Sequence, residues 1–173
     1  MPDERTTGNK ADDRKFTRLA WALAAALLTF AVFLPALNNG FVGWDDPENL
    51  LLNPHFRGFG PAQLKWMFTT FHMGPYQPLS WLSYAADYLF WGLDPFGYHL
   101  TNVILHAAGA AVLFLLAARL LALASGEEDS HGLALPALFA ALFFSLHPLR
   151  VESVAWATER RDVLCGLFYI LAA

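Results

Sequence analysis

Residues 19–37 carry no charged side chain and consist almost entirely of Ala, Leu, Phe and Val. An uncharged apolar run of about 18 residues or more is long enough to cross a bilayer as a helix. A second, largely apolar run covers residues 99–124, and a shorter third run covers residues 132–147. Because 56% of the whole chain is also hydrophobic, the sequence predicts an all-α polytopic membrane protein.

A fourth apolar run covers residues 163–173. A helix of this length cannot cross about 30 Å of hydrocarbon. We therefore expect three complete spans and the start of a fourth. We also expect the chain to be the front part of a longer protein.

The distribution of basic residues sets the predicted orientation. Five of the eleven Lys and Arg residues lie in residues 1–18, which places the N-terminus in the cytoplasm. Residues 38–98 and 148–162 then form external loops, and residues 125–131 form a cytoplasmic turn. A cleaved signal peptide is the alternative for the first run, but that run is longer than a typical signal core and lacks a suitable cleavage site. The expected location is a bacterial inner membrane or the endoplasmic reticulum membrane.

The first external loop contains two segments with helical periodicity. Residues 61–71 gather apolar side chains on one helical face, and residues 78–92 carry two stripes: Leu79, Leu82, Ala86 and Leu89 in one, and Trp81, Tyr84, Tyr88 and Trp91 in the other. These amphipathic helices either lie parallel to the membrane among the lipid headgroups or build a small external core. The near absence of charge favours the membrane-parallel arrangement.

Strongly polar residues collect on the external side of this topology. The acidic pair Asp45 and Asp46 follows the first span, and His99, Asn102 and His106 share one face of the outer half of the second. The second external loop and its borders add a larger set: His147, Arg150, Glu152, Glu159, Arg160, Arg161 and Asp162.

Each of these groups also has a purely structural interpretation. The aspartates could cap a helix, the polar residues of the second span could be interhelical hydrogen bonds, and the charged group could be a solvated helix start. Their shared side favours a functional site, because polar groups in a membrane face a cavity or one another. Arg150, Arg160 and Arg161 also lie outside against the positive-inside tendency, which suggests that they perform a task.

Charge and spacing narrow the classes of function. The net charge is −4 and basic runs with interleaved aromatic residues are missing, so no nucleic-acid partner is expected. The carboxylates and histidines match no strict metal-ligand spacing, and a divalent cation such as Mg²⁺ or Mn²⁺ has only weak support. A transporter or channel is an alternative, but residues 110–123 on the inner side are apolar except for Arg119. A non-catalytic anchor is a third alternative, although it would need neither the acidic pair nor the histidines.

Three blocks carry a family resemblance: "GFVGWDDPENLLLNP", "YQPLSWLSYAADYLFWGLDPFGYHLTNVILHA" and "LFFSLHPLRVESVAWATERRDVL". They closely resemble the N-terminal membrane region of the transmembrane and tetratricopeptide-repeat O-mannosyltransferase family. More broadly, they resemble glycosyltransferases of the C-type fold that use lipid-phosphate sugars. The resemblance covers the chain from about residue 20 onward, and the family's remaining spans and tetratricopeptide repeats have no counterpart in it. It implies a cytosolic N-terminus and a first external loop with membrane-parallel helices and an acidic catalytic motif.

The resemblance also implies a reaction. A hexose, of the mannose type, moves from a polyprenyl phosphate to a hydroxyl of an acceptor polypeptide, Ser or Thr, with inversion. An inverting displacement needs a base near the attacking hydroxyl, and Asp45 or Asp46 stands at the matching position. Asp46 directly precedes Pro47, which suits the first position of a helix. This favours Asp46 as the helix cap and therefore Asp45 as the base.

The remaining polar residues would bind the donor. Arginine forks suit the departing lipid phosphate, which would explain the three external arginines. Glu159 and Asp162 would hold those arginines or a cation, and His99, Asn102 and His106 would face the donor. The truncated chain is not expected to be active on its own.

Overall fold

A computed structural model describes residues 4–126 and 131–173. Most of the predicted cytoplasmic turn, and residues 1–3 of the basic N-terminus, therefore lie outside the described residues. Within the described part, every regular element is a helix, which confirms the all-helical class.

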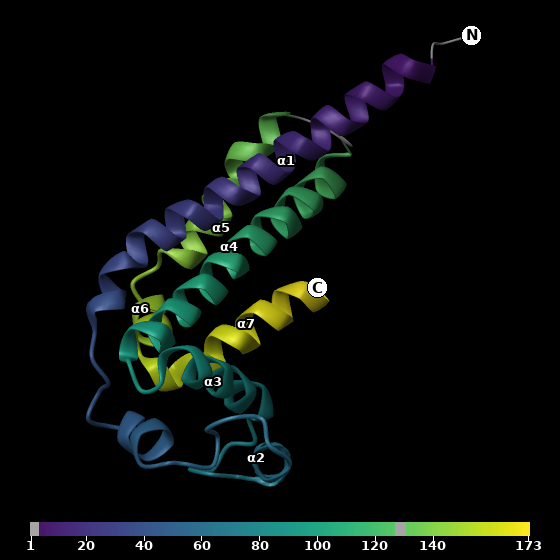
Figure 1. The fold of residues 1–173 in the computed structure, drawn as a ribbon. Helices are drawn as coiled ribbons and strands as arrows, with labels where there is room; N and C mark the ends of the chain where they lie inside the picture. Colours follow the sequence, from purple (N-terminus) through teal and green to yellow (C-terminus); the bar gives the residue numbers. More distant parts are fainter. Residues whose placement is uncertain (1–3, 127–130) are drawn as a thin grey trace.

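Three helices form the long body of the molecule: α1 (Glu4–Phe33), α4 (Pro95–Ser125) and α5 (Ala134–Ser145). They lie side by side (Figure 1) around a core of small and aromatic side chains: Ala22, Ala25, Phe114, Ala137 and Ala141. Small residues let the helix backbones approach closely, as is typical of helices packed in a membrane.

Within residues 4–126 and 131–173, two stretches are long and apolar enough to cross a membrane, Lys15–Asn38 and Pro95–Ser125. The first includes the short 3₁₀ turn η1 (Leu34–Asn38) that follows α1. The third predicted span corresponds to α5 and the preceding turn η3 (His131–Leu133), but α5 alone has 12 residues, fewer than a span requires. The last helix, α7 (Arg160–Ala172), runs back along α4 and corresponds to the predicted start of a fourth span (Figure 1).

The remaining elements gather at one end of this body, which we call the loop end. They are the π-helical turn η2 (Pro47–Leu51), α2 (Pro61–Thr69), α3 (Pro78–Trp91), α6 (Arg150–Ala155) and the turn η4 (Ala157–Glu159) (Figure 1). Proline stands in the first turn of α2, α3 and α4, where its missing N–H has no helical partner to lose. Gly92 ends α3 with a positive φ of 61°, which a residue with a side chain rarely adopts.

The aromatic stripe of α3 points into a small core at the loop end. Trp81 and Tyr84 are fully buried and pack with Phe56, Met67 and Tyr98. The rings meet edge to face, a favourable arrangement that also removes their large apolar area from water. For Trp81 and Tyr84 the alternative interpretation, a small core, is therefore the correct one, and the expectation that these two rings settle among headgroups is wrong. Trp91, at the end of the stripe, stays 41% exposed. The outer face of α3 keeps exposed apolar side chains, among them Leu79, Leu89 and Phe90.

Candidate functional site

Asp46 lies in the loop after α1 and connects it by hydrogen bonds to the turn before α7. Its carboxylate is fully buried and accepts hydrogen bonds from the backbone N–H groups of Val42 (2.7 Å) and Thr158 (3.2 Å). It also accepts from the Thr158 hydroxyl (2.8 Å) and from Nε1–H of Trp156 (3.0 Å). Four donors compensate the cost of burying this polar group. The side chain does not cap the following turn, so the predicted capping role of Asp46 is wrong: its oxygens are used by tertiary contacts instead.

Asp45 has different surroundings from its neighbour. The residue is half-buried, and its backbone carbonyl accepts two hydrogen bonds from Asn49, at 2.9 Å from N and 3.0 Å from Nδ2. Its carboxylate has no hydrogen-bond partner among the residues that the structure describes. Asp45 can therefore reach a ligand with an oxygen that no protein group occupies, whereas Asp46 cannot.

Arg160 forms the centre of a buried network and has no exposed surface. Its guanidinium donates to Oδ1 of Asn102 (2.7 Å), to the carbonyl of Tyr98 (2.7 Å) and to the hydroxyl of Ser83 (3.2 Å), and it forms an ion pair with Asp87. It also lies over the ring of Tyr84, 4.6 Å from the centroid. The prediction that Arg160 binds a donor phosphate does not fit this geometry, because its donors already serve protein acceptors.

Asn102 belongs to the same network. Its side-chain nitrogen donates to the carbonyls of Trp156 (2.9 Å) and Val154 (3.3 Å), while its oxygen accepts from Arg160. Asn102 is thus fully used in fastening α4 to the segment before α7. Sequence reasoning missed Asp87, although a lone carboxylate in the largely apolar helix α3 was a signal that it needs a cationic partner.

The two histidines of α4 are buried and contact backbone carbonyls. Nε2 of His106 lies 2.8 Å from the carbonyl oxygen of Ser145 at the end of α5, and its ring meets Phe33 edge-on at 5.2 Å. Nε2 of His99 lies 3.4 Å from the carbonyl oxygen of Gly40, and its Nδ1 is buried with no hydrogen-bond partner in the described part of the chain. For His106 the geometry fits the packing interpretation.

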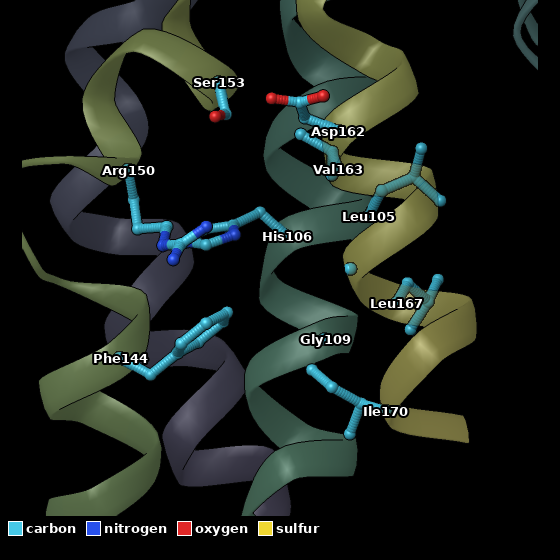
Figure 2. A pocket seen from close by; sticks show the side chains of 11 residues that line it. Leu105, His106, Gly109, Phe144, Arg150, Ser153, Asp162, Val163, Leu167 and Ile170 are labelled. Carbon is cyan, nitrogen blue, oxygen red and sulfur yellow. The ribbon is translucent and has the colours of Figure 1, made fainter. Parts of the chain in front are cut away.

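A small cavity of about 30 Å³ lies between α4, α6 and α7 (Figure 2). Arg150 reaches toward His106 there, 4.4 Å above the ring of Phe144, and Asp162 lies at one end with Ser153. Nε of Arg150 is buried and has no hydrogen-bond partner among the described residues. This volume suits one or two water molecules rather than a sugar phosphate.

A larger groove, of about 710 Å³, lies between the segment 75–80 and one face of α7. We call it the α7 groove. Its charged residues, Arg161 and Asp162, stand at the start of the helix, at the loop end. Farther along the same face of α7 the lining is apolar and aromatic: Leu164, Cys165, Phe168 and Tyr169. The opposite wall is formed by residues 75–80. The polarity of the groove thus changes along its length from charged to apolar.

Arg161 lines this groove and is paired with Glu159. Its guanidinium donates to Glu159 at 2.6 Å, yet the side chain stays 41% exposed and open to a further acceptor. Burial raises the pKa of the Glu159 carboxyl, and Asp162 acts in the same direction, whereas Arg161 lowers it. The predicted pairing of Glu159 with an arginine thus occurs, and Asp162 lines the groove beside them.

Two further predicted residues lie elsewhere. His147 accepts a hydrogen bond at Nδ1 from the N–H of Leu149 (3.3 Å), and Glu152 is exposed on α6. Neither residue lines the α7 groove or the small cavity. No group of three or more His, Cys, Asp and Glu residues arranged to hold a metal occurs within residues 4–126 and 131–173.

Comparison with known proteins gives several relatives. The chain is 34% identical over 162 residues to protein O-mannosyl-transferase Tmtc1 of Drosophila melanogaster, a match covering 89% of this chain and 18% of the relative. It is 33% identical over 173 residues to human protein O-mannosyl-transferase TMTC1, covering 92% of this chain and 18% of the relative. Identity to protein O-mannosyl-transferase tmtc2 of Xenopus laevis is 39% over 97 residues, 56% of this chain and 10% of the relative. The chain thus spans about a fifth or less of these relatives. No family model matches it, and no solved structure matches it.

Proposed function

Because the chain belongs to the family of the TMTC protein O-mannosyl-transferases, we propose that it forms the N-terminal part of a membrane glycosyltransferase. The full-length protein would transfer a mannose-type hexose from a polyprenyl-phosphate donor to a Ser or Thr hydroxyl of a polypeptide. The described residues would supply the donor site and the base, and the enzyme would need the rest of the protein for activity.

The observation that carries this proposal is the changing polarity of the α7 groove. A polyprenyl-phosphate sugar is an amphiphile with one anionic head and a long apolar tail. Arg161 stands at the loop end of the groove and offers a guanidinium fork to a phosphate. Phe168 and Tyr169, farther along α7, offer an apolar wall to the first isoprene units. A small water-soluble substrate has no apolar tail that could pack against such a wall.

The reaction would proceed as one inverting displacement. The acceptor hydroxyl oxygen attacks the anomeric carbon of the sugar, a new C–O glycosidic bond forms, and the bond from that carbon to the phosphate oxygen breaks. The hydroxyl proton passes to the carboxylate of Asp45, which acts as the general base. The electron pair of the broken bond leaves with the polyprenyl phosphate, whose negative charge Arg161 stabilises.

The proposal also assigns the molecule to a membrane. The two apolar stretches would span it with the N-terminus in the cytoplasm, in a bacterial inner membrane or in the endoplasmic reticulum. The loop end, with Asp45 and Arg161, would then lie on the external or lumenal surface. A divalent cation is not required by the displacement as written.

The test uses the full-length protein in membrane vesicles with polyprenyl-phosphate mannose and an acceptor peptide. Arg161→Gln should raise the donor KM by about tenfold or more, the usual effect of losing a charge-assisted hydrogen bond. Lys65→Gln, an exposed cation of α2 that lies outside the groove, is the matched control and should leave the donor KM unchanged.

A labelling experiment gives an independent measure. Cys165 lines the groove and is exposed, so a thiol reagent should modify it, as read by peptide mapping. Excess donor lipid should slow this modification in the wild type and less so in the Arg161→Gln variant. If the wild-type protein transfers no sugar from the lipid donor and the lipid does not protect Cys165, the proposal is wrong.

A further inference from the structure

Trp44 stands directly before Asp45, and its large apolar side chain is mostly exposed. Its indole is 76% exposed. It stacks on the ring of Trp156 with centroids 5.9 Å apart and an angle of 22° between the ring planes. A single exposed tryptophan needs no explanation, but one that is supported from beneath by a second indole is a preformed surface.

The support under Trp44 is itself fixed. Trp156 donates Nε1–H to the buried carboxylate of Asp46, and the same carboxylate accepts two hydrogen bonds from Thr158. Trp44, Asp45 and Asp46 are consecutive residues of one loop, which the hydrogen bonds of Asp46 and the stacking of Trp44 on Trp156 hold in place. The Asp45 carboxylate has no partner within residues 4–126 and 131–173. The loop leaves two groups available to a ligand, the open surface of the Trp44 indole and the unpartnered carboxylate of Asp45.

We propose that Trp44 is a binding platform for the hexopyranose ring of the donor. One face of such a ring presents several C–H groups whose weak positive charge suits the negative face of an indole, while its hydroxyls need polar acceptors at the edge. Asp45 supplies such an acceptor beside the platform. A preformed surface of this kind binds without the entropy cost of ordering a mobile side chain. This inference rests on the proposed transfer reaction and adds a residue that selects for the sugar rather than for the lipid.

A second role for an exposed tryptophan is to anchor a loop among lipid headgroups. The surroundings of Trp44 disfavour it. The next residue, Asp45, carries a carboxylate that no described residue pairs with, and moving such a group toward hydrocarbon is costly. A headgroup anchor also gains nothing from Trp156 and its hydrogen bond to Asp46. The two roles differ in what they recognise, so an experiment can separate them.

The experiment uses the full-length protein in membrane vesicles and three variants. Trp44→Leu removes the π face, Trp44→Phe keeps a smaller one, and Phe90→Leu changes an 83% exposed aromatic residue of α3 as the matched control. Trp44→Leu should raise the KM for polyprenyl-phosphate mannose about five- to tenfold, Trp44→Phe less, and Phe90→Leu not at all. The inhibition constant of polyprenyl phosphate without a sugar should stay at the wild-type value in all three. An equal rise in both constants would assign Trp44 to the lipid, and no rise in either would remove it from the site.

Sugar binding without turnover separates this inference from the proposed reaction. Methyl α-mannopyranoside is added to the full-length protein in detergent, and saturation-transfer NMR reports contact with the sugar protons. The wild type should give a signal that Trp44→Leu loses and Phe90→Leu keeps, even if no transfer activity is found. A signal of this kind without transfer activity would support the sugar platform and contradict the transferase proposal. A wild-type protein without a signal, or a signal unchanged in Trp44→Leu, would overturn the platform.

Discussion

Asp45 and Asp46 are neighbours in the sequence, but burial gives them different tasks. The carboxylate of Asp46 accepts four hydrogen bonds and holds two loops together, whereas that of Asp45 has no donor in the part of the chain that the structure describes. The sequence was sufficient to single out the pair, because two carboxylates directly after an apolar span are unusual. It could not show which one is buried, because three of the four donors belong to Trp156 and Thr158, more than a hundred positions away in the chain.

This difference gives a prediction for two isosteric substitutions in the full-length protein. Asp45→Asn should reduce the transfer rate at least about a hundredfold, the usual contribution of a positioned base, and leave the melting temperature in detergent near the wild-type value. Asp46→Asn should lower the melting temperature, because an amide cannot accept from all four donors. The cost is on the order of 1–3 kcal/mol. Initial transfer rates and thermal unfolding, measured on the same preparations, distinguish the two effects.

The control for this pair is Glu48→Gln, an exposed carboxylate in the next turn, which should alter neither quantity. Normal transfer by the Asp45→Asn variant would mean that the base lies elsewhere. Glu159, paired with Arg161 beside the α7 groove, and Glu152 on α6 would then be the residues to test.

At the scale of elements, α3, α4 and α7 are fastened by one buried arginine. Arg160 begins α7, its ion-pair partner Asp87 lies on α3, and Asn102 lies on α4. The periodicity of the sequence placed these helices, and it correctly put Asn102 and Arg160 on the same side of the membrane body. It did not predict that the two residues bind each other, because interhelical contacts are not encoded in the spacing within one helix.

The aromatic stripe of α3 illustrates the same limit. Its spacing predicted a continuous apolar face, and such a face exists, but Phe56 and Met67 cover it rather than lipid. Phe56 comes from an irregular segment without periodicity, so no pattern in the sequence predicted its contact with α3. Helical periodicity thus identifies which residues share a face and leaves open what that face contacts.

The buried network gives a prediction about stability. Arg160→Met should destabilise the full-length protein by about 3–5 kcal/mol, because it leaves the carboxylate of Asp87 buried without its cation. Adding Asp87→Leu should recover part of this loss, since no unpaired charge then remains. Arg161→Met is the matched control: its side chain is partly exposed, and its loss should change the melting temperature little. A double variant less stable than Arg160→Met alone would contradict the assignment.

At the scale of the whole molecule, Asp46, Asn102 and Arg160 come together around residues 154–160 at the loop end, although they are far apart in the sequence. The side of the membrane on which they lie stays a prediction. Two of the three arginines that the predicted topology places outside, against the positive-inside tendency, have acidic partners. Arg160 is neutralised by Asp87 and Arg161 by Glu159, so fewer free positive charges remain in the loop than the sequence suggests. The five basic residues of positions 1–18 therefore remain the stronger signal for orientation.

This orientation is tested by the accessibility of two introduced cysteines to a membrane-impermeant thiol reagent, in a Cys165→Ser background of the full-length protein. Lys65→Cys, exposed on α2 at the loop end, should react in sealed cells or in vesicles of the same orientation. Ser125→Cys, exposed at the end of α4, should react only after the membrane is permeabilised. The reason is that α4 runs along the apolar body from the loop end, where α2 lies, to Ser125 at the opposite end (Figure 1). The reverse pattern would place the loop end in the cytoplasm, and with it Asp45, Trp44 and the α7 groove. Equal labelling of both cysteines in sealed membranes would show that α4 does not cross the bilayer, and the proposal of a lipid-linked donor would lose its basis.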